Sequence, residues 1–389
     1  MSIKILSFVF LPLLSSGHEI QAFMQMIKNT GSSTFFSKFF EEADKVETGK
    51  CAFVDMDFTF ISACFEVAVL AAQIEMGKYS FTNDDIPVVL GLKAAHLDCQ
   101  NVVYKDSDER QQEVVGKNKL GVSLQEVVAK ITAVFDDKLE IQKDALKPLI
   151  AMWNYVVYQG TQKKPNCDYL RTTVSRRLLY KMDETTRSEI INKAFKLHPT
   201  RREDRYYYKA GDGKIYPVVI ENQAPVYPEM LELFKALKKS TFSLHLISAS
   251  DITFVKAMAT SKDLESMGIE AHGSKPNNDS EEQMLFGNGF TNDYDNKVKT
   301  MDEIITKKNC KFLFAAGDSM GDHRMLEKVL SEEPKGYALF INGPTTKLRT
   351  KNDLEDLAKR FDLRAHIQDV DEKNTEWKKI MPIKNATSI

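Results

Sequence analysis

Three apolar runs in this chain end abruptly in polar residues, and this pattern constrains the fold more than any other feature of the sequence. The runs are 51–54, 244–247 and 312–316, and the residues that follow them are Asp55, Ser248 and the pair Gly317-Asp318. Short continuous apolar runs are typical of strands that are buried on both faces, as in parallel sheets. Because open parallel sheets bind ligands outside the carboxyl ends of their strands, the sequence predicts a polar site there.

Two pairs of acidic residues stand at these strand ends. Asp55 and Asp57 are two residues apart, and Asp318 and Asp322 are four apart. One carboxylate can attack phosphorus while another transfers a proton, and Mg²⁺ prefers oxygen ligands. We interpret the pairs as parts of a magnesium-dependent phosphoryl-transfer site. The plainer alternatives are that the first pair caps the next helix and that Gly-Asp forms only a turn.

A lysine supplies the positive charge that such a site needs. Lys297 and Lys299 both begin a helical pattern whose apolar face carries Met301, Ile304 and Ile305. Lys297 lies four residues before Met301 and shares that face, whereas Lys299 points away. We therefore prefer Lys297, although most lysines are solvated surface charges. Its ammonium would neutralise charge on the nucleophile and on the transferring phosphoryl group.

The four segments together resemble the haloacid dehalogenase superfamily of phosphatases. The motifs of that family are Asp-x-Asp-x-Thr, a strand-ending Ser or Thr, a Lys, and Gly-Asp-x-x-x-Asp, and all four stand here without a substitution. The resemblance covers roughly residues 48–66 and 225–345. It implies an α/β fold with a doubly wound parallel sheet, the Rossmannoid core of the family, and an inserted, mainly helical cap domain.

The resemblance also implies catalytic roles. Asp55 would be the nucleophile that becomes an aspartyl phosphate, and Asp57 would protonate the leaving group and later accept a proton from water. Thr59 would brace the Asp57 carboxylate. Ser248, followed by Ala249 in the turn, would donate a hydrogen bond to a phosphoryl oxygen. Superfamily enzymes that cleave carbon–halogen bonds lack the second carboxylate, so Asp57 favours phosphate chemistry.

The implied cofactor is Mg²⁺. Its ligands would be the Asp55 carboxylate, the backbone carbonyl of Asp57 and the carboxylate of Asp318. Asp322 would hold a water molecule of the ion or position Asp318.

Residues 59–243 separate the first motif from the second, far more than a crossover helix needs, so the sequence predicts an inserted domain. We assign 18–66 and 225–389 to the catalytic core and 67–224 to the cap. The insertion resembles the first cap class of the superfamily, seen in phosphoserine and phosphocholine phosphatases. Apolar residues at helical spacing predict helices over 66–76, 124–135, 144–158 and 187–195. An alternating stretch follows at 215–220 after a turn at 211–213.

The cap would recognise the leaving group and exclude water when it closes. Aromatic side chains could hold a quaternary ammonium group, and arginines could clamp a carboxylate or a second phosphate. Burial in the cap's own core, or simple exposure, is the alternative for every candidate. The candidates are Trp153, Tyr155, Tyr158, Arg171, Arg176 and Arg205, of which we select Trp153, Arg171 and Arg205 beside Thr59 and Ala249.

Beyond the insertion the sequence predicts a helix that opens at Pro228, a helix over 252–267 with Gly268 as its terminator, and a hairpin turn at 287–289. The strand 337–341 completes the expected sheet. The charge-rich tail follows residue 347, and its last dozen residues are expected to be poorly tied down.

Composition limits the partners and the redox chemistry. Lys and Arg number 53 against 55 for Asp and Glu, so no net field attracts nucleic acid or an anionic membrane. The five cysteines are odd in number and show no CxxC spacing, which argues against a zinc site and a full disulfide framework. We interpret Cys51 and Cys310, which flank core strands, as small apolar residues.

The amino terminus leaves the compartment open. Lys4, the apolar run 5–14 and the small residues at 15–17 form either an export signal or an apolar element that packs on the core. The run is too short to span a bilayer. The first alternative predicts a periplasmic or secreted protein, and the second predicts a cytoplasmic one.

The sequence favours a phosphomonoesterase that acts on a small phosphorylated metabolite, either phosphocholine-like or phosphoserine-like. One alternative is a superfamily protein phosphatase for phosphotyrosine. Another, from a different class, is a binding or regulatory module that turns nothing over. Such modules usually lose a nucleophile or a metal ligand, whereas Asp55, Asp57 and Asp318 are all present here. No protein partner is indicated.

Overall fold

The computed structural model describes residues 17–91, 122–136, 143–161, 174–196, 203–261, 264–276, 289–332, 336–343, 348–371 and 376–379. Its centre is a sheet with the strand order β11-β10-β9-β1-β6-β7-β8. Neighbouring strands from β11 to β7 are parallel, and the edge pair of β7 and β8 is antiparallel. The strands are β1 (Lys50–Val54), β6 (Phe242–Asp251), β7 (Glu270–Pro276), β8 (Gly289–Phe290), β9 (Phe312–Gly317), β10 (Gly336–Asn342) and β11 (Ala365–Asp369).

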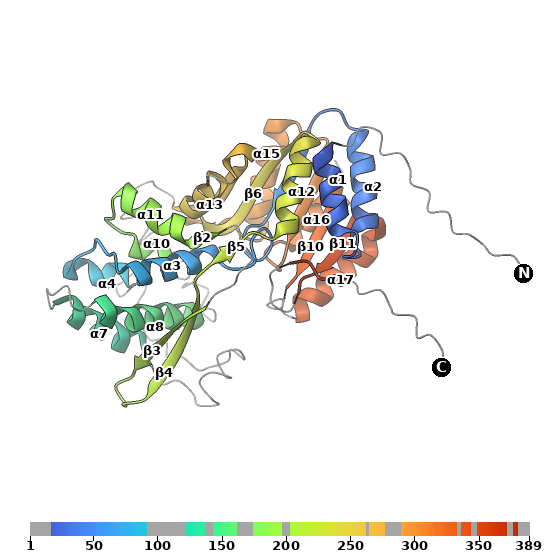
Figure 1. Ribbon diagram of the computed structural model, residues 1–389. Coiled ribbons are helices and arrows are strands. Elements are labelled where there is room, and N and C mark those ends of the chain that lie inside the picture. Colours follow the sequence, from blue (N-terminus) through green and yellow to red (C-terminus); the bar gives the residue numbers. More distant parts are fainter. Residues whose placement is uncertain are drawn as a thin grey trace, which may run out of the picture.

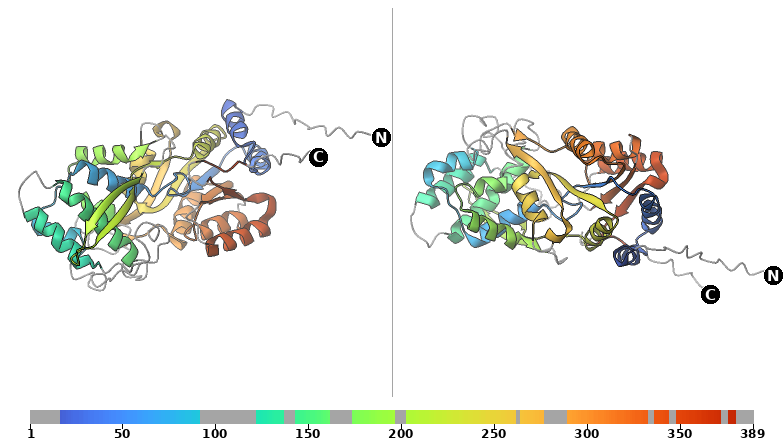
Figure 2. Two further views of the ribbon diagram at one scale, coloured as in Figure 1. Left: turned by 60° about the horizontal axis from the view of Figure 1, so that its bottom comes forward. Right: turned by 90° about the horizontal axis from the view of Figure 1, so that it is seen from above.

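Helices cover both faces of the sheet (Figures 1 and 2). Successive side chains of β1 alternate between the two layers. Ala52 and Val54 pack in a core cluster with α1, α2 and α12, whereas Cys51 and Phe53 pack in another with α15, α16 and α17. The predicted α/β fold with a doubly wound parallel sheet is therefore confirmed. The helices are α1 (His18–Ile27), α2 (Ser33–Asp44), α12 (Pro228–Lys239), α13 (Ile252–Ala259), α15 (Asp295–Lys308), α16 (His323–Ser331) and α17 (Leu348–Phe361).

A mainly helical insertion lies between β1 and β6 and has a core of its own, centred on the fully buried Trp153. A hairpin of β3 and β4 packs on α8. Helix α3 joins the two parts, because Leu70 and Ile74 belong to the core of the insertion while Phe65 and Val69 belong to the main core. The elements are α3 (Phe65–Met76), α4 (Ile86–Val89), α7 (Leu124–Asp136), α8 (Lys143–Thr161), α10 (Val174–Leu178), α11 (Glu184–Ala194), β2 (Phe195–Lys196), β3 (Glu203–Lys209), β4 (Ile215–Glu221) and β5 (Ala224–Pro225).

The four helices predicted in the insertion correspond to α3, α7, α8 and α11, and all four match within three residues at each end. Helix α11 begins earlier than expected, because the Asp183 side chain accepts a hydrogen bond from the backbone N–H of Thr186 and caps it. The helix at Pro228 is also confirmed.

The helix predicted over 252–267 is wrong in its length. Helix α13 ends at Ala259, and a 3-10 turn follows at Glu265–Met267. The Thr260 hydroxyl donates to the Lys256 carbonyl, a local bond that competes with continued helix. Gly268 ends the turn with φ 66°, so the predicted terminator is correct. Residues 287 and 288 of the expected hairpin turn lie outside the described residues.

The sheet does not end at the strand predicted over 337–341. After α17 the chain returns as β11, which pairs parallel with β10. Trp377 is fully buried beyond it, and its backbone N–H donates to the Glu229 carboxylate at 3.2 Å. Part of the charge-rich tail is therefore anchored to the core, while residues 380–389 lie outside the described residues.

The interpretation of Cys51 and Cys310 as free apolar residues is wrong. The two cysteines form a disulfide whose Cα atoms are 5.9 Å apart. Their spacing of 259 residues gave no sign of this pairing. The sheet brings them together, since β1 and β9 are neighbours and Cys310 lies two residues before β9.

The apolar amino-terminal run lies outside the described residues. Within the described part of the chain, no helix has both the length and the apolar character needed to cross a bilayer.

Candidate active site

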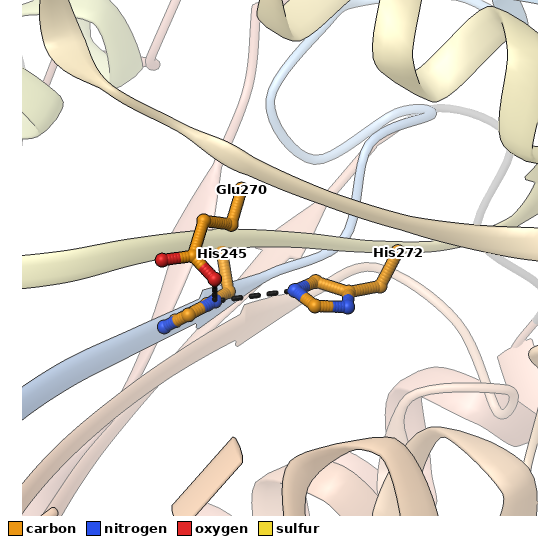
Figure 3. A group of neighbouring side chains, drawn as sticks. All are labelled: His245, Glu270 and His272. Carbon is orange, nitrogen blue, oxygen red and sulfur yellow. Dashed lines mark hydrogen bonds and ion pairs between the residues drawn. The ribbon is translucent and has the colours of Figure 1, made fainter. Parts of the chain in front are cut away.

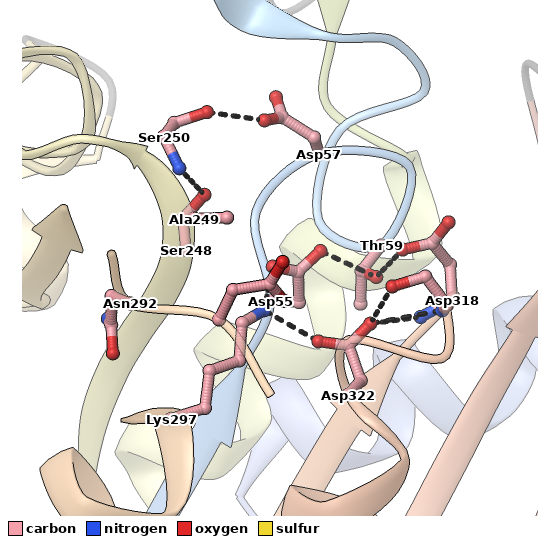
Figure 4. A network of polar contacts seen from close by, with 12 residues as sticks. Asp55, Asp57, Thr59, Ser248, Ala249, Ser250, Asn292, Lys297, Asp318 and Asp322 are labelled. Carbon is pink, nitrogen blue, oxygen red and sulfur yellow. Dashed lines mark hydrogen bonds and ion pairs between the residues drawn. The ribbon is translucent and has the colours of Figure 1, made fainter. Parts of the chain in front are cut away.

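The candidate site lies at the carboxyl ends of three adjacent strands, β9, β1 and β6. Val54 and Ala316 are register partners, and the Asp55 backbone N–H donates to the Ala316 carbonyl at 2.9 Å. This register sets Asp55 beside the loop that carries Asp318. Strand β6 lies on the other side of β1 and brings Ser248 to the same end of the strands (Figure 4).

Three carboxylates and one ammonium form the centre of the site. Oxygen atoms of Asp55, Asp318 and Asp322 lie within 4.8 Å of one another. Lys297 from α15 inserts between two of them, with its Nζ at 2.5 Å from Asp55 Oδ1 and 2.6 Å from Asp322 Oδ1. Its side chain is 3% exposed. By contrast, Lys299 is exposed and donates to Asn296, so the facing argument selected the lysine that reaches the carboxylates.

Asp322 organises the loop after β9. Its Oδ2 accepts hydrogen bonds from the backbone N–H groups of Asp318 and Ser319, at 3.1 and 3.0 Å, and from the Ser319 hydroxyl at 2.8 Å. Its Oδ1 is engaged by Lys297. A side chain on Gly317 would clash with Asp322, so glycine is required for this close approach. Because its Oδ2 alone accepts three hydrogen bonds from this loop, Asp322 holds the loop and Asp318 in position.

Thr59 is placed differently from what the family resemblance implied. Its hydroxyl lies 3.3 Å from Asp55 Oδ2 and 3.3 Å from Asp318 Oδ1, so it links the nucleophile candidate to the second strand-end acid. The Asp57 carboxylate is braced by other groups. The backbone N–H of Phe65 donates to Oδ1 at 2.7 Å, and the Ser250 hydroxyl donates to Oδ2 at 2.7 Å. Figure 4 shows Asp57 turned toward Ser250 and away from the three-carboxylate cluster.

Burial makes the ionised form of the acids costly. It raises the pKa of Asp55 to about 8, assisted by the neighbouring Asp322 and opposed by Lys297. Burial, with the charges of Asp322 and Asp55, also holds the pKa of Asp318 well above its ordinary value. Burial raises the pKa of Asp57 as well, against the two hydrogen bonds that it accepts. Burial alone would lower the pKa of Lys297, but Asp322 and Asp55 raise it above its ordinary value.

The donor set fits a hard divalent cation. Asp55 and Asp318 converge from two strand ends, and one ammonium cannot balance three carboxylates. Burial is the main cause of the raised pKa values of Asp55 and Asp318, and the charge of the neighbouring Asp322 adds to it in both cases. Mg²⁺ takes oxygen ligands and keeps several waters, so two carboxylates would suffice to hold it.

Ser248 and Ala249 lie on β6 near Asp55 (Figure 4). Ser248 is 1% exposed, and its Oγ accepts a hydrogen bond from the backbone N–H of Ser250 at 3.1 Å. The strand continues to Asp251, three residues beyond its expected end.

Of the residues selected in the insertion, the two that the structure describes, Trp153 and Arg205, do not lie at this site. Trp153 is fully buried in the core of the insertion, and its indole N–H donates to the Leu90 carbonyl at 3.3 Å, so no face is free for a ligand. Arg205 is exposed on the β3–β4 hairpin. Arg171 and the side chain of Tyr158 lie outside the described parts of the chain. Tyr155 is also buried.

Arg176 is the candidate that does approach the core. Its guanidinium lies 2.6 Å from Asp251 Oδ1, at the end of β6, and it also contacts the Thr253 hydroxyl. Glu66 is a neighbour that the sequence analysis missed. It is 7% exposed, and its Oε1 accepts the Asp251 backbone N–H at 2.8 Å. The available signal was an acid in the first turn of α3, directly before the apolar run 67–72. Burial raises its pKa well above the ordinary value.

No protein-family model and no curated protein matches this chain. Among solved structures, a conserved protein of unknown function from Anaerococcus prevotii is similar, with a TM-score of 0.56 and 15% identity over 85% of this chain and 88% of that one. This likeness shows a shared fold. A substrate-bound phosphoserine phosphatase aligns with a TM-score of 0.31 and 11% identity, over 81% of this chain and 99% of that chain. A HAD family hydrolase from Salmonella enterica gives 0.33 and 12%, over 90% and 78%. The last two scores are too low to carry an argument.

Proposed function

We propose that this protein is a phosphomonoesterase of the haloacid dehalogenase type, which works through an aspartyl phosphate on Asp55 and requires Mg²⁺. One observation carries the proposal. Asp55, buried at the end of a central parallel strand, contacts Lys297 at 2.5 Å and has an oxygen within 4.8 Å of Asp318. A nucleophile, a cation and a second acid from three distant segments thus meet at one point.

In the first half of the reaction, an Asp55 carboxylate oxygen attacks phosphorus and the bond from phosphorus to the leaving oxygen breaks. Lys297 would offset the negative charge that the phosphate brings next to Asp55. A bound Mg²⁺, held by Asp55 and Asp318, would supply further charge neutralisation. Asp57 would donate its proton to the departing alkoxide. Its raised pKa supports this role, because a protonated acid is needed near neutral pH.

In the second half, Asp57 accepts a proton from water, the water oxygen attacks phosphorus, and the bond from phosphorus to Asp55 breaks. This returns the Asp55 carboxylate and releases inorganic phosphate. Both steps require Asp57 to leave Ser250 and Phe65 and turn toward Asp55. We propose that substrate binding drives this rotation, since only one side-chain and one backbone hydrogen bond must be exchanged.

We propose a small phosphorylated metabolite as the substrate, phosphocholine-like or phosphoserine-like. We assign residues 67–224 to a cap and 18–66 with 225–389 to the catalytic core. Arg176 supports this assignment, because it extends from the insertion to Asp251 at the sheet edge that carries the site. Its side chain is 14% exposed and would border the space that the leaving group of a bound substrate occupies.

The test is phosphate release from p-nitrophenyl phosphate by the full chain with Mg²⁺ and with a chelator. We expect activity that requires the metal and is abolished by Asp55→Asn, while Lys299→Gln, a matched change of an exposed residue on the same helix, keeps it. Activity that survives both the chelator and Asp55→Asn would refute the mechanism. Inactivity of the natural chain toward every phosphomonoester would favour a non-catalytic module.

A substrate panel then separates the remaining possibilities. Phosphocholine, phosphoserine and sugar phosphates represent small metabolites, and a phosphotyrosine peptide represents protein substrates. We expect the highest kcat/KM for a small amine-bearing phosphomonoester. A preference for the peptide would instead identify a protein phosphatase.

A further inference from the structure

A second cluster of ligating side chains lies on β6 and β7, nearer the β8 edge of the sheet. His245 is on β6, and Glu270 and His272 are on the adjacent parallel strand β7. His245 is the register partner of Glu270, and Ile247 is the partner of His272. Because residues two apart on a strand share a face, Glu270 and His272 point to the same side of the sheet (Figure 3).

The three ligand atoms already have the spacing of a metal coordination shell. His245 Nδ1 lies 3.2 Å from His272 Nε2 and 3.7 Å from Glu270 Oε2, and the three side chains offer ligand atoms within 4.8 Å of one another. A tetrahedral Zn²⁺ with bonds of about 2.0–2.1 Å separates its neighbouring ligand atoms by about 3.3 Å. Figure 3 shows a ring nitrogen of His272 and a carboxylate oxygen of Glu270 both directed at the same ring nitrogen of His245.

One side chain of this cluster, His245, is fully buried, whereas another, Glu270, is partly exposed to solvent. The His245 side chain is fully buried and its ring stacks on Phe53, with centroids 5.5 Å apart. The Glu270 side chain is 42% exposed, which provides a route for an ion. A histidine in the middle of a central strand is a costly choice where an aliphatic residue would fill the same space. Its Nδ1 contacts His272 and Glu270, whereas Nε2, the other ring nitrogen, has no hydrogen-bond partner among the described residues.

The protonation states suit metal binding. Burial lowers the pKa of His245 to about 4 and also lowers that of His272, so both imidazoles are neutral and keep a lone pair at pH 7. Asn292 holds β7 in place, because its side-chain amide donates to the His272 carbonyl at 3.0 Å. One feature opposes a cation. Lys308 of α15 donates to Glu270 Oε1 at 2.6 Å and places a positive charge beside the cluster.

We propose that His245 Nδ1, His272 Nε2 and Glu270 Oε2 form a site for a borderline divalent transition-metal ion of the Zn²⁺ type, with solvent in the remaining position. Nitrogen ligands select such ions, whereas the all-oxygen site at Asp55 and Asp318 suits Mg²⁺. The cysteine pattern argued against a zinc site, but this cluster uses no cysteine. The ion would tie β6 to β7, three residues before Ser248. The site does not depend on the proposed phosphatase function.

The test is Co²⁺ binding to the full-length, chelator-treated chain, because tetrahedral Co²⁺ absorbs visible light strongly and octahedral oxygen-bound Co²⁺ absorbs weakly. To silence the carboxylate site, the titration is done in an Asp318→Asn background. We expect one equivalent of tetrahedral Co²⁺ that Zn²⁺ displaces, and a rise in the thermal midpoint with Zn²⁺. His272→Gln should weaken binding by at least about 100-fold. His366→Gln, a matched change of a part-buried histidine on β11, should leave binding unchanged.

A variant that should bind Co²⁺ more tightly is a control, because misfolding can cause only a loss of binding. Lys308→Gln removes the opposing charge and frees Glu270 Oε1, so it should bind Co²⁺ severalfold more tightly than the parent. The proposal is overturned if the parent shows no tetrahedral band, if His272→Gln keeps the band, or if Lys308→Gln fails to tighten binding. Since Asp318 is already replaced, failure of the phosphatase proposal would not affect any of these results.

Discussion

Thr59 joins two carboxylates that repel each other. Its single hydroxyl proton serves Asp55 Oδ2 or Asp318 Oδ1, each at 3.3 Å, and the methyl group fills a fully buried position. Both acids have raised pKa values, so a donor between them lowers the cost of keeping one ionised. Thr59 therefore acts on Asp55, the proposed nucleophile, rather than on Asp57.

This placement predicts the behaviour of two variants. Thr59→Val keeps the shape and removes the donor, and a hydrogen bond to a charged group is worth about 1.5–3 kcal/mol, so kcat/KM should fall by roughly 10- to 100-fold. Thr59→Ser keeps the hydroxyl and should retain most of the activity. The measurement is steady-state hydrolysis of p-nitrophenyl phosphate. Equal losses in both variants would show that Thr59 matters only for packing.

At the same scale, the sequence predicted which residues reach the site better than it predicted their partners. Asp55, Ser248 and Asp318 follow from strand ends, and Lys297 follows from the helical period. The hydrogen bonds of Asp57 to Ser250 and Phe65 depend on how loops fold back, which no spacing encodes. Trp153 was misplaced because an aromatic residue on a helix fills a core or a pocket with the same pattern.

At the scale of elements, the contact between α10 and the end of β6 is an ion pair with little solvent. The Arg176 side chain is 14% exposed and that of Asp251 is 6% exposed. The Asp251 side chain also caps α13, because it accepts a hydrogen bond from the backbone N–H of Thr253. The pair thus connects the helical insertion to the strand that carries Ser248.

Arg176→Gln should destabilise the protein by about 2–4 kcal/mol, because it leaves a buried carboxylate without its cation. Adding Asp251→Asn should recover part of this loss, since asparagine is neutral and still caps α13. Urea unfolding of the two single variants and the double variant measures the coupling. Strictly additive effects would contradict a direct interaction between the two side chains.

Glu229, which accepts a hydrogen bond from the backbone N–H of Trp377, should make the stability of the protein depend on pH. Burial raises its pKa above the ordinary value of 4.5, and its Oε2 has no partner among the described residues. The folded protein therefore holds a proton that the unfolded chain releases. Stability from this group is fully present below pH 4.5 and is lost as the pH rises through the folded pKa.

Glu229→Gln should remove that loss, because its amide oxygen still accepts from Trp377 but carries no charge. We expect the variant to be more stable than the natural protein at pH 7.5 and about equal to it at pH 4. Urea unfolding at both pH values is the measurement. An unchanged difference between the two proteins at the two pH values would refute this account of Glu229.

The elements themselves were predictable where the apolar period was long and uninterrupted, as in α3, α7 and α8. Helix α13 was drawn too long because residues after Ala259 keep some apolar character while local hydroxyl bonds end the helix. Strand β11 was missed because His366, Gln368 and Asp369 are polar, although Gln368 is buried. Its place at the sheet edge depends on β10 for pairing.

At the scale of the whole molecule, the Cys51–Cys310 disulfide closes a loop that contains the entire insertion. It joins β1 to the segment that leads into β9, the two strands whose ends carry Asp55 and Asp318. The bond lies in the core cluster shared with α15 and α16. Holding these two strands together restricts the unfolded chain more than the folded one.

Replacing both cysteines by alanine should lower the free energy of unfolding by about 2–5 kcal/mol, the usual range for loss of a native disulfide. Cys64→Ala, which removes a free cysteine, is the matched control. Chemical unfolding gives the difference, and a non-reduced peptide map should contain a peptide pair that joins residues 51 and 310. If that pair is absent from the oxidised protein, the cross-link is wrong.

The central claim is that segments far apart in the sequence converge to make Asp55 a nucleophile. An aspartyl phosphate is reduced by borohydride to homoserine, whereas a free carboxylate is not. We predict that enzyme quenched during turnover of a phosphomonoester with Mg²⁺, then treated with borohydride, contains homoserine at position 55 by peptide mass spectrometry. Turnover without homoserine at 55, or with homoserine at another aspartate, would contradict the account.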